Sequence, residues 1–271
     1  LNFKSLDEFI NSTIPEKIQF KGELNIGEPN SEYEALRKLK AISKKNQIYS
    51  NFIGMGYYGT YTPYVILRNI LENPGWYTSY TPYQPEVAQG RLEMLLNFQQ
   101  MIVDFTGMDI ANASLLDEGT AAAEAMGLSH RLNKSDSNLV FVSENCHPQT
   151  IDVIQTRAEP MGLKVLVGNE DKVLEQLKED IVCGVLQYPG TLGDIKDPSE
   201  AISKIHKKNG KAILVCDLLA LSMLKTPREL GADIAVGSSQ RFGIPMGYGG
   251  PHAAFFATKD EYKRSMPGRI V

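Results

Sequence analysis

The chain has 271 residues, of which 42% are apolar and 22% are charged, as is typical of a globular protein with a substantial core. Its formal net charge of −4 argues against binding to nucleic acid or to an anionic membrane surface. No apolar run reaches the roughly 20 residues of a membrane span, and the first residues lack the apolar core of a secretory signal. The three well-separated cysteines predict reduced core thiols in a cytosol-like compartment, without a disulfide framework or metal site: Cys146, Cys183 and Cys216.

Residues 1–50 are polar and rich in lysine. An apolar cluster at residues 6–10 predicts a short helix that ends before Pro15, and an apolar stripe predicts a second helix over residues 32–45. We interpret this part of the chain as an N-terminal helical arm that packs on another subunit or on the main domain.

The composition changes after this arm, because no lysine occurs from residue 46 to residue 133. Ten aromatic residues lie between Tyr49 and Tyr83. One interpretation is a well-packed core. We favour a buried interface with another subunit or domain, since interfaces are depleted of lysine and enriched in tyrosine and tryptophan, and so many tyrosine hydroxyls need partners.

Residues 54–59 have the form Gly-x-Gly-x-x-Gly, which in a dinucleotide site follows a firm strand and opens a helix directly. Here the preceding apolar segment is short, and Pro63 separates the glycines from a helix predicted over residues 64–73. A nicotinamide or flavin site is therefore disfavoured. We expect glycines that let the backbone turn tightly beside another surface.

Two prolines, Pro82 and Pro85, stiffen the loop before a long helix that is predicted to end at Gly107. Such a loop can hold side chains at defined positions, and the side chains that it displays are Tyr80, Tyr83, Gln84 and Glu86. The alternative is a rigid connector that displays nothing of functional use.

Another helix begins after Ser114 or Asp117, either of which can cap it. The small residues Gly119 and Thr120 leave the N–H groups of the first turn open, which is where phosphates bind. Asp117 and Glu118 lie at the same mouth and would repel a phosphate. The position therefore favours an anion, whereas the local charge opposes one.

From residue 138 onward, short apolar strands alternate with amphipathic helices, which predicts a mostly parallel sheet with helices on both faces. The predicted strands are residues 138–143, 164–167, 181–187, 212–216 and, last, 234–236, and the predicted helices are residues 148–159, 171–179 and 199–209, with a helical turn at 218–224. We expect one α/β domain over residues 51–271, truncated at its end because no closing helix follows.

In a sheet of this kind, the residues just past the strand ends gather in one crevice. That crevice would collect His147, Asp217, Ser238, Ser239 and Gln240, together with the helix start at Gly119 and Thr120. A ring over a flat cofactor, a carboxylate for a pyridinium nitrogen and a helix N-terminus for a phosphate are what pyridoxal phosphate needs. Each signal is weak alone, since such a histidine is usually structural and such an aspartate usually caps a turn.

A Schiff base would need a lysine near these strand ends, and none occurs between Lys225 and Lys259. An independent pyridoxal enzyme would have to use one of these two lysines. Neither lies at the strand-end position, so this alternative is disfavoured.

Five segments resemble the N-terminal half of the glycine cleavage system P-proteins, the glycine dehydrogenases (decarboxylating): residues 46–56, 80–93, 111–125, 147–150 and 237–257. The resemblance runs from about Asp7 to the last residue. It implies a pyridoxal-phosphate enzyme of fold type I, similar to aspartate aminotransferase, truncated before its small C-terminal domain. The family decarboxylates glycine and passes the aminomethyl group to the lipoyl arm of the H-protein. It has two homologous halves, either fused or separate as α and β subunits.

In this family the C-terminal half carries the Schiff-base lysine, and the N-terminal half is a degenerate copy. The resemblance places the lysine position at Gln240, the ring-stacking histidine at His147 and the pyridinium partner at Asp217. An amide cannot form a Schiff base, so this segment should neither hold nor use pyridoxal phosphate alone. The family's proline-rich loop reaches toward the partner half's cofactor, a role that falls on Tyr80 and Tyr83, and on Gln84 and Glu86.

The resemblance also implies partners: the C-terminal half or β subunit, the lipoyl domain of the H-protein, and a second copy of the full chain in a homodimer. It favours the fused long-chain form. The lysine-rich composition fits a bacterial cytoplasm, with a mitochondrial matrix form as the alternative. A different hypothesis is a regulatory module that binds an anion or a cofactor without a covalent bond, in the vestigial pocket around Thr120.

Overall fold

The computed structural model describes residues 2–77, 81, 83–247 and 252–271 of the chain. By their internal contacts they form two compact units, residues 1–50 and residues 51–271. Within the described ranges, no helix combines the length and the apolar character that crossing a membrane requires.

The first unit contains two capped helices, α1 (Leu6–Thr13) and α2 (Glu32–Ser43), with a short 3-10 turn, η1 (Glu16–Ile18), between them. A capping box opens α2, because Ser31 and Glu34 each satisfy a backbone N–H group of the other. Neither helix buries a side chain among the residues described. Local hydrogen bonds, not a core, therefore define both helices, and their apolar stripes stay exposed.

The second unit is built on a seven-stranded sheet with the order β1-β7-β6-β5-β4-β2-β3. The neighbours from β6 to β3 pair in parallel, whereas β7 runs antiparallel to both β6 and β1. The expected mostly parallel sheet is confirmed. Its strands are β1 (Ile110–Ala111), β2 (Leu139–Ser143), β3 (Lys164–Gly168), β4 (Cys183–Tyr188), β5 (Lys211–Cys216), β6 (Ile234–Ser238) and β7 (Ala254–Thr258).

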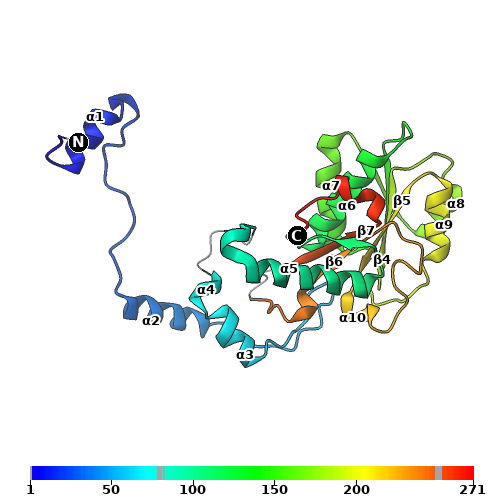
Figure 1. The fold of residues 1–271 in the computed structure, drawn as a ribbon, viewed down its shortest axis with the longest axis horizontal. Coiled ribbons are helices and arrows are strands. Elements are labelled where there is room, and N and C mark those ends of the chain that lie inside the picture. The colour runs from blue at the N-terminus through cyan, green and yellow to red at the C-terminus, as the bar shows by residue number, and fades with distance from the viewer. Residues whose placement is uncertain (1, 78–80, 82, 248–251) are drawn as a thin grey trace. The chain divides into compact units, whose positions relative to one another are not determined.

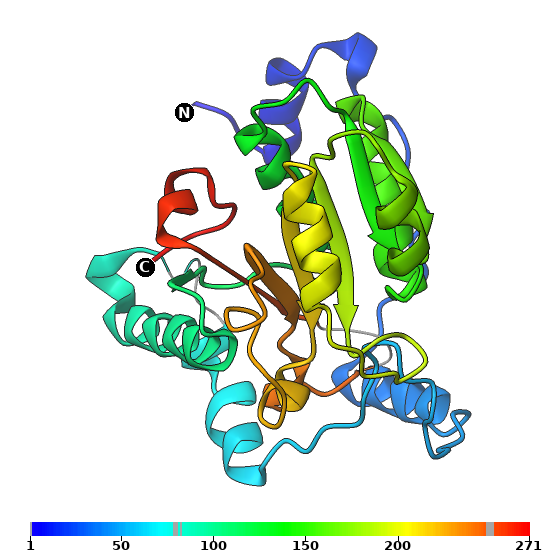
Figure 2. The same cartoon turned by 90° about the vertical axis from the view of Figure 1, so that its right-hand side faces the viewer.

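Helices cover both faces of this sheet, as Figures 1 and 2 show. One core lies under α6 and α7, and a second lies under α5, α8, α9 and α10. The helical elements are α3 (Tyr64–Ile66), η2 (Leu67–Leu71), α4 (Pro74–Tyr77), α5 (Pro85–Thr106), α6 (Glu118–Leu132), α7 (Pro148–Ala158), η3 (Glu159–Met161), α8 (Glu170–Gln176), α9 (Ser199–Lys207), α10 (Leu218–Leu221), η4 (Gln240–Phe242) and η5 (Asp260–Ser265).

Each strand supplies both cores, because successive side chains of a strand point to opposite faces of the sheet. In β2, Val140 and Val142 lie in the core beneath α6 and α7, whereas Phe141 lies in the core shared with α5 and α9. In β7, Phe256 and Phe255 divide in the same way, and both are fully buried. A strand covered on both faces is apolar at nearly every position, which explains the continuous apolar runs in the sequence.

The long helix α5 ends where the sequence predicts. Gly107 adopts a left-handed conformation with a φ of 68° and closes the last turn. A Cβ atom at this position would lie 3.0 Å from side-chain atoms of both Arg228 and Thr226. Glycine is therefore required twice here, by the backbone angle and by the close approach of the loop after α10.

One prediction about the elements is wrong, and another is confirmed in part. Residues 234–236 do not form the last strand, because β7 follows and pairs along the whole of β6. The helix predicted over residues 64–73 forms over residues 64–71, but as the short α3 followed by η2, a π-helical segment. In the second case few tertiary contacts exist to enforce regular helix geometry, since most apolar side chains of this segment are exposed.

A buried carboxylate ties together the ends of three strands and one helix. Asp233 is 3% exposed and accepts hydrogen bonds from His206 Nε2 at 2.7 Å, from Lys259 Nζ at 2.5 Å and from the N–H of Ala212 at 2.8 Å. Burial acts to raise the pKa of Asp233, but the three hydrogen bonds outweigh it and lower the pKa to about 2.

We expect Asp233→Asn to lower the free energy of unfolding by about 2–3 kcal/mol near pH 7, because the lowered pKa represents a stabilised carboxylate. This stability is present above the ordinary aspartate pKa and is lost as the pH falls through the folded value of about 2. Urea denaturation of the 271-residue chain measures the change. The matched control is Asp260→Asn, which removes an exposed pair with Lys263 and should change stability by about 0.5 kcal/mol or less.

Candidate functional site: a polar pocket at the strand ends

The carboxyl ends of four neighbouring parallel strands meet at one edge of the sheet. His147 follows β2 and begins α7, Gln187 lies near the end of β4, and Asp217 follows β5. Ser238 ends β6, and Gln240 opens the 3-10 turn after it. These five residues line one small cavity of about 20 Å³.

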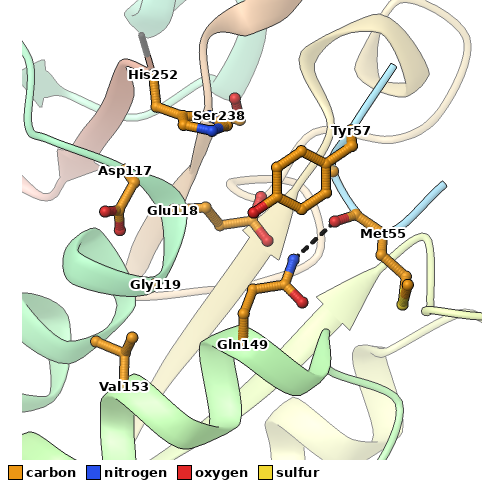
Figure 3. A pocket seen from close by; sticks show the side chains of 10 residues that line it. Met55, Tyr57, Asp117, Glu118, Gly119, Gln149, Val153, Ser238 and His252 are labelled. Carbon is orange, nitrogen blue, oxygen red and sulfur yellow. Dashed lines mark hydrogen bonds between the residues drawn. The ribbon is translucent and has the colours of Figure 1, made fainter. Parts of the chain in front are cut away.

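A larger cavity of about 210 Å³ opens beside the small one. Figure 3 shows its lining, in which Glu118 at the start of α6 points toward the side where Tyr57 and Gln149 lie. The amide of Gln149 donates a hydrogen bond to the carbonyl of Met55 at 2.7 Å. Glu118 also lines the small cavity. The two cavities are therefore neighbours, and Gly56, Glu118 and Ser238 belong to both linings.

The structure brings some of the predicted pocket residues together and not others. His147, Asp217 and Gln240 line the small cavity, and Gly119 lines the larger one. Ser239 lines neither of them, although its side chain is buried and its hydroxyl has no hydrogen-bond partner in the part of the chain described. Thr120 also lies outside both linings.

One N–H group at the start of α6, that of Thr120, is not open, contrary to the prediction. Asp117 caps the helix, and its Oδ1 atom accepts the N–H of Thr120 at 2.7 Å. The backbone donor that a phosphate would need is therefore already used. Together with the acidic charge of Glu118 beside it, this geometry gives the hypothesis of a phosphate or anion site around Thr120 no support.

His147 is held as a neutral ring. The hydroxyl of Thr191 donates to the carbonyl of Asn145 at 2.9 Å, so its oxygen accepts from Nδ1 of His147, also at 2.9 Å. The Nε2 atom then carries the lone pair and faces Gln187 Nε2 at 3.5 Å and Glu118 Oε1 at 3.8 Å. Burial lowers the pKa of His147, although the Asp217 carboxylate opposes this effect. The ring is thus fixed in orientation and uncharged at neutral pH.

Several buried polar atoms around the cavity lack a hydrogen-bond partner within the described residues. They include both amide atoms of Gln240, which is 2% exposed, and Oε1 of Gln187 and of Glu118. Native interiors rarely leave such groups unsatisfied. The cavity is therefore polar at its walls, and about 20 Å³ is enough space for a single water molecule to serve them.

Asp217 does not face the cavity as a free carboxylate. Arg241 donates to it twice, from Nε to Oδ1 at 3.0 Å and from Nη2 to Oδ2 at 2.9 Å. The guanidinium carbon of Arg241 lies 3.6 Å from the centre of the Tyr58 ring. Burial raises the pKa of Tyr58, and the charge of Asp217 adds to the rise. Carboxylate, guanidinium and phenol ring thus form one stack, which we call the Tyr58–Arg241–Asp217 stack.

The glycines of residues 54–59 form a turn against this site. Gly54 and Gly56 have φ angles of 65° and 85°, and Met55 between them has a φ of 54°. A Cβ atom on Gly56 would lie 3.7 Å from the His147 ring. This is the tight turn beside another surface that the sequence predicts, and the segment does not open a helix as a dinucleotide fingerprint would.

The described residues of the proline-rich loop line neither cavity. Tyr80 falls outside the described residues. Tyr83, Gln84 and Glu86 are exposed and belong to neither lining. The guanidinium carbon of Arg269 lies 5.7 Å from the centre of the Tyr83 ring.

The stretch from just before the glycine turn to the end of α4 exposes large apolar side chains. Phe52, Tyr61 and Tyr64 are 92%, 97% and 88% exposed, and their neighbours share this exposure: Ile53, Val65, Ile66, Leu67, Ile70, Leu71 and Tyr77. We call residues 52–77 the exposed apolar segment. The interpretation of this region as a well-packed core is wrong for these residues. A contiguous apolar surface of this kind marks an interaction surface.

Neither flanking lysine reaches the pocket. Lys259 pairs with Asp233, which precedes β6 and so lies at the opposite end of the sheet. Lys225 is exposed and lines neither cavity. Among the residues that the structure describes, no group of three metal-binding side chains comes together either. The pocket therefore offers neither a Schiff-base amine nor a metal site.

A family model described as the glycine cleavage system P-protein matches residues 1–271. The chain belongs to this family. It is 83% identical over its whole length to a glycine dehydrogenase (decarboxylating) of Pelagibacter ubique and 57% identical to that of Stutzerimonas stutzeri. In each case it spans 28% of the relative's length. These P-protein relatives are bacterial, and the chain corresponds to an N-terminal portion of them.

Solved structures agree with this assignment. A crystal structure of glycine decarboxylase (P-protein) in inhibitor-bound form superposes with a TM-score of 0.89 at 34% identity, covering 98% of this chain and 61% of that one. A sphingosine-1-phosphate lyase from Burkholderia pseudomallei superposes with a TM-score of 0.66 at 13% identity, over 91% of this chain and 62% of that one, and shows the shared fold alone. The P-protein portion thus has the expected fold of type I pyridoxal enzymes.

The residues of this pocket do not fit pyridoxal phosphate. The strand-end position holds Gln240, whose amide cannot form a Schiff base, and Arg241 already occupies both oxygens of Asp217. The small cavity beside Asp217, at about 20 Å³, holds about one water molecule and by itself has no room for a pyridine ring. The N–H of Thr120 at the start of α6 is taken by Asp117 and is not available to a phosphate.

Sequence reasoning missed two residues that decide this outcome. Arg241 directly follows Gln240. It lies just past the end of β6, and Asp217 lies just past the end of the neighbouring strand β5, so an ion pair between them could have been expected from the sequence. Tyr58 lies inside the glycine-rich turn, where only the glycines drew attention. The role of Glu118 was underestimated, since it is not only a charge at the helix mouth but a buried member of both cavities.

Burial raises the pKa of Glu118 to about 7, and the nearby Asp217 carboxylate adds to the rise. Because the folded pKa exceeds the unfolded value, the protonated form is stabilised below pH 4.5 and the stability is lost as the pH rises through about 7. We expect the free energy of unfolding to fall by about 2–3 kcal/mol from this group between pH 5 and pH 8.

Glu118→Gln should remove this dependence and raise the melting temperature relative to wild type at pH 8 more than at pH 5. Thermal unfolding of both proteins across this range measures it. Glu124→Gln, in the same helix but paired with Arg157 at the surface, is the control and should leave the pH dependence unchanged. Equal pH dependence in wild type and Glu118→Gln would contradict the assignment.

Proposed function

We propose that this chain is the portion of a glycine decarboxylase that supplies structure and completes an active site carried elsewhere on the full-length protein, and that it binds no pyridoxal phosphate itself. The observation that carries the proposal is the occupied pyridinium site: Asp217 is paired with Arg241, beside Gln240. The full protein would decarboxylate glycine with pyridoxal phosphate and transfer the aminomethyl group to the lipoyl arm of the H-protein. Pyridoxal phosphate supplies the electron sink for that chemistry.

The lengths of the relatives support a second, cofactor-bearing portion. The chain spans 28% of the curated relatives but 61% of the solved P-protein chain. The solved chain is therefore less than half as long as those relatives, as expected if P-proteins consist of two parts of similar size. We infer that the other part, fused or as a separate subunit, carries the Schiff-base lysine.

The exposed apolar segment supports contact between the two parts. Residues 52–77 present aromatic and aliphatic side chains that a free surface rarely gathers, without a lysine among them. The proline-rich loop follows directly, with Tyr83, Gln84 and Glu86 exposed. We propose that the other part covers this surface and that the loop reaches its active site, where it positions glycine and excludes water. A homodimer of the full chain and a bacterial cytoplasmic location complete the proposal.

The location of the cofactor can be tested directly. When the full-length protein is loaded with pyridoxal phosphate, reduced with borohydride and mapped by peptide mass, we expect a stoichiometric pyridoxyl adduct at a lysine outside residues 1–271. The reason is that no lysine of this chain reaches the pocket. Trace adducts on exposed lysines serve as the background. A stoichiometric adduct at Lys225, Lys259 or any other lysine of this chain would refute the proposal.

The role of the loop can be tested by a matched pair of variants in α5. Glu86→Gln, at the loop end of the helix, should reduce kcat/KM of the full-length protein for glycine decarboxylation by about tenfold or more, because misplaced positioning groups weaken catalysis strongly. Glu93→Gln makes the same change at an exposed position further along α5 and should leave the rate within about twofold. Exchange of labelled bicarbonate into glycine measures both, and equal rates would exclude the loop from the site.

A further inference from the structure

The Tyr58–Arg241–Asp217 stack has the geometry of a bound flat cation. The carboxylate of Asp217 accepts two hydrogen bonds along the edge of the guanidinium, and the Tyr58 ring covers its face at 3.6 Å. Planar guanidinium groups make such bidentate pairs and stack on aromatic rings. A pyridinium ring needs the same two things, a carboxylate for its nitrogen and a flat group over its face. The chain thus satisfies Asp217 with a cation of its own.

The stack also occupies the carboxylate that a pyridinium nitrogen would need. Arg241 and Asp217 are about one-fifth exposed at their side chains, so the pair is largely shielded from water. What remains between His147, Gln187 and Gln240 is a cavity of about 20 Å³, room for about one water molecule. Placing an amine at position 240 would not, by itself, create space for a ring.

The same stack fastens the glycine turn to the sheet. Two residues close to Tyr58 in sequence also hydrogen-bond to the turn after β6. The hydroxyl of Thr60 donates to the carbonyl of Ile244 at 2.9 Å, and the hydroxyl of Thr62 donates to the carbonyl of Gly243 at 2.7 Å. Both acceptors lie within three residues of Arg241. The segment therefore has three attachments to one turn, and it leads directly into the exposed aromatic rings of residues 61 and 64.

We propose that Arg241 is an internal substitute for the cofactor ring: it occupies Asp217, excludes pyridoxal phosphate from this pocket, and through Tyr58 fixes residues 54–62. The proposal rests on the proposed function in that it takes the pocket as a degenerate cofactor site. It goes beyond the proposed function because it assigns the exclusion of pyridoxal phosphate to Arg241, and not only to the missing lysine at position 240. Two measurements on the full-length protein separate these assignments.

The first measurement is the amount of pyridoxyl adduct that forms at position 240. Full-length Gln240→Lys, Gln240→Lys/Arg241→Ser and Gln240→Lys/Arg228→Ser are incubated with pyridoxal phosphate, reduced with borohydride and mapped by peptide mass. Arg228 pairs with Asp109 away from the pocket, so its loss is the matched control. We expect labelling at position 240 near background in the first and third variants and at least about tenfold higher in the second, because removal of the guanidinium opens the site.

Adding Asp217→Asn to the Gln240→Lys/Arg241→Ser protein should return the labelling to background, since the ring nitrogen then loses its partner. This arm distinguishes a formed site from an exposed lysine. Strong labelling of Gln240→Lys alone would overturn the proposal, as would equal labelling of Gln240→Lys and Gln240→Lys/Arg241→Ser. A stoichiometric adduct at a lysine within residues 1–271 of the wild-type protein would instead refute the proposed function, so the two failures are distinct.

The second measurement needs no cofactor. Hydrogen exchange of full-length Arg241→Ser should be at least about tenfold faster than wild type in peptides covering residues 54–62, with exchange in β4 and β5 unchanged. Unchanged β4 and β5 show that the variant is folded. Arg228→Ser should show no acceleration in residues 54–62. Protection in that segment that is the same in Arg241→Ser and in wild type would refute its attachment through Tyr58.

Discussion

The parallel pairing of β2, β4, β5 and β6 determines where the strand-end polar residues of the site lie. Each of these strands is buried on both faces, so its apolar residues fix the register and the polar residues of the site appear at or just past its carboxyl end. His147, Asp217 and Gln240 are far apart in sequence but become neighbours because their strands end at one edge. The pocket is thus a consequence of core packing, and it persists whether or not it is used for chemistry.

A pocket built in this way must satisfy its polar groups without a ligand. The structure does so largely from within: Arg241 pairs with Asp217, Thr191 orients His147, and Asp117 takes the N–H of Thr120. What is left over is a set of buried amide and carboxyl atoms around a cavity of one water molecule. Burial also limits the negative charge in the pocket, because it raises the pKa of Glu118 and so favours its protonated form.

The sequence predicts much of this arrangement, because apolar runs and strand-end polar residues follow directly from the two-sided burial of the sheet. It does not reveal β7, since a short apolar run after a glycine-rich stretch gives no sign of its antiparallel pairing. Arg241 and Tyr58 are missed because their interaction joins residues 183 positions apart. The aromatic stretch was ambiguous for a physical reason: core and interface residues share one composition, and only the exposure of side chains such as Tyr61 separates them.

The exposed apolar segment has a consequence for how the chain can exist in isolation. Phe52, Tyr61 and Tyr64 are almost fully accessible, and side chains of this kind associate with any similar surface that they meet. Neither core on the two faces of the sheet includes these side chains, so we expect their exposure to limit the solubility of the chain more than the stability of its fold. Its solubility, more than its melting temperature, should report whether the covering surface is present during synthesis.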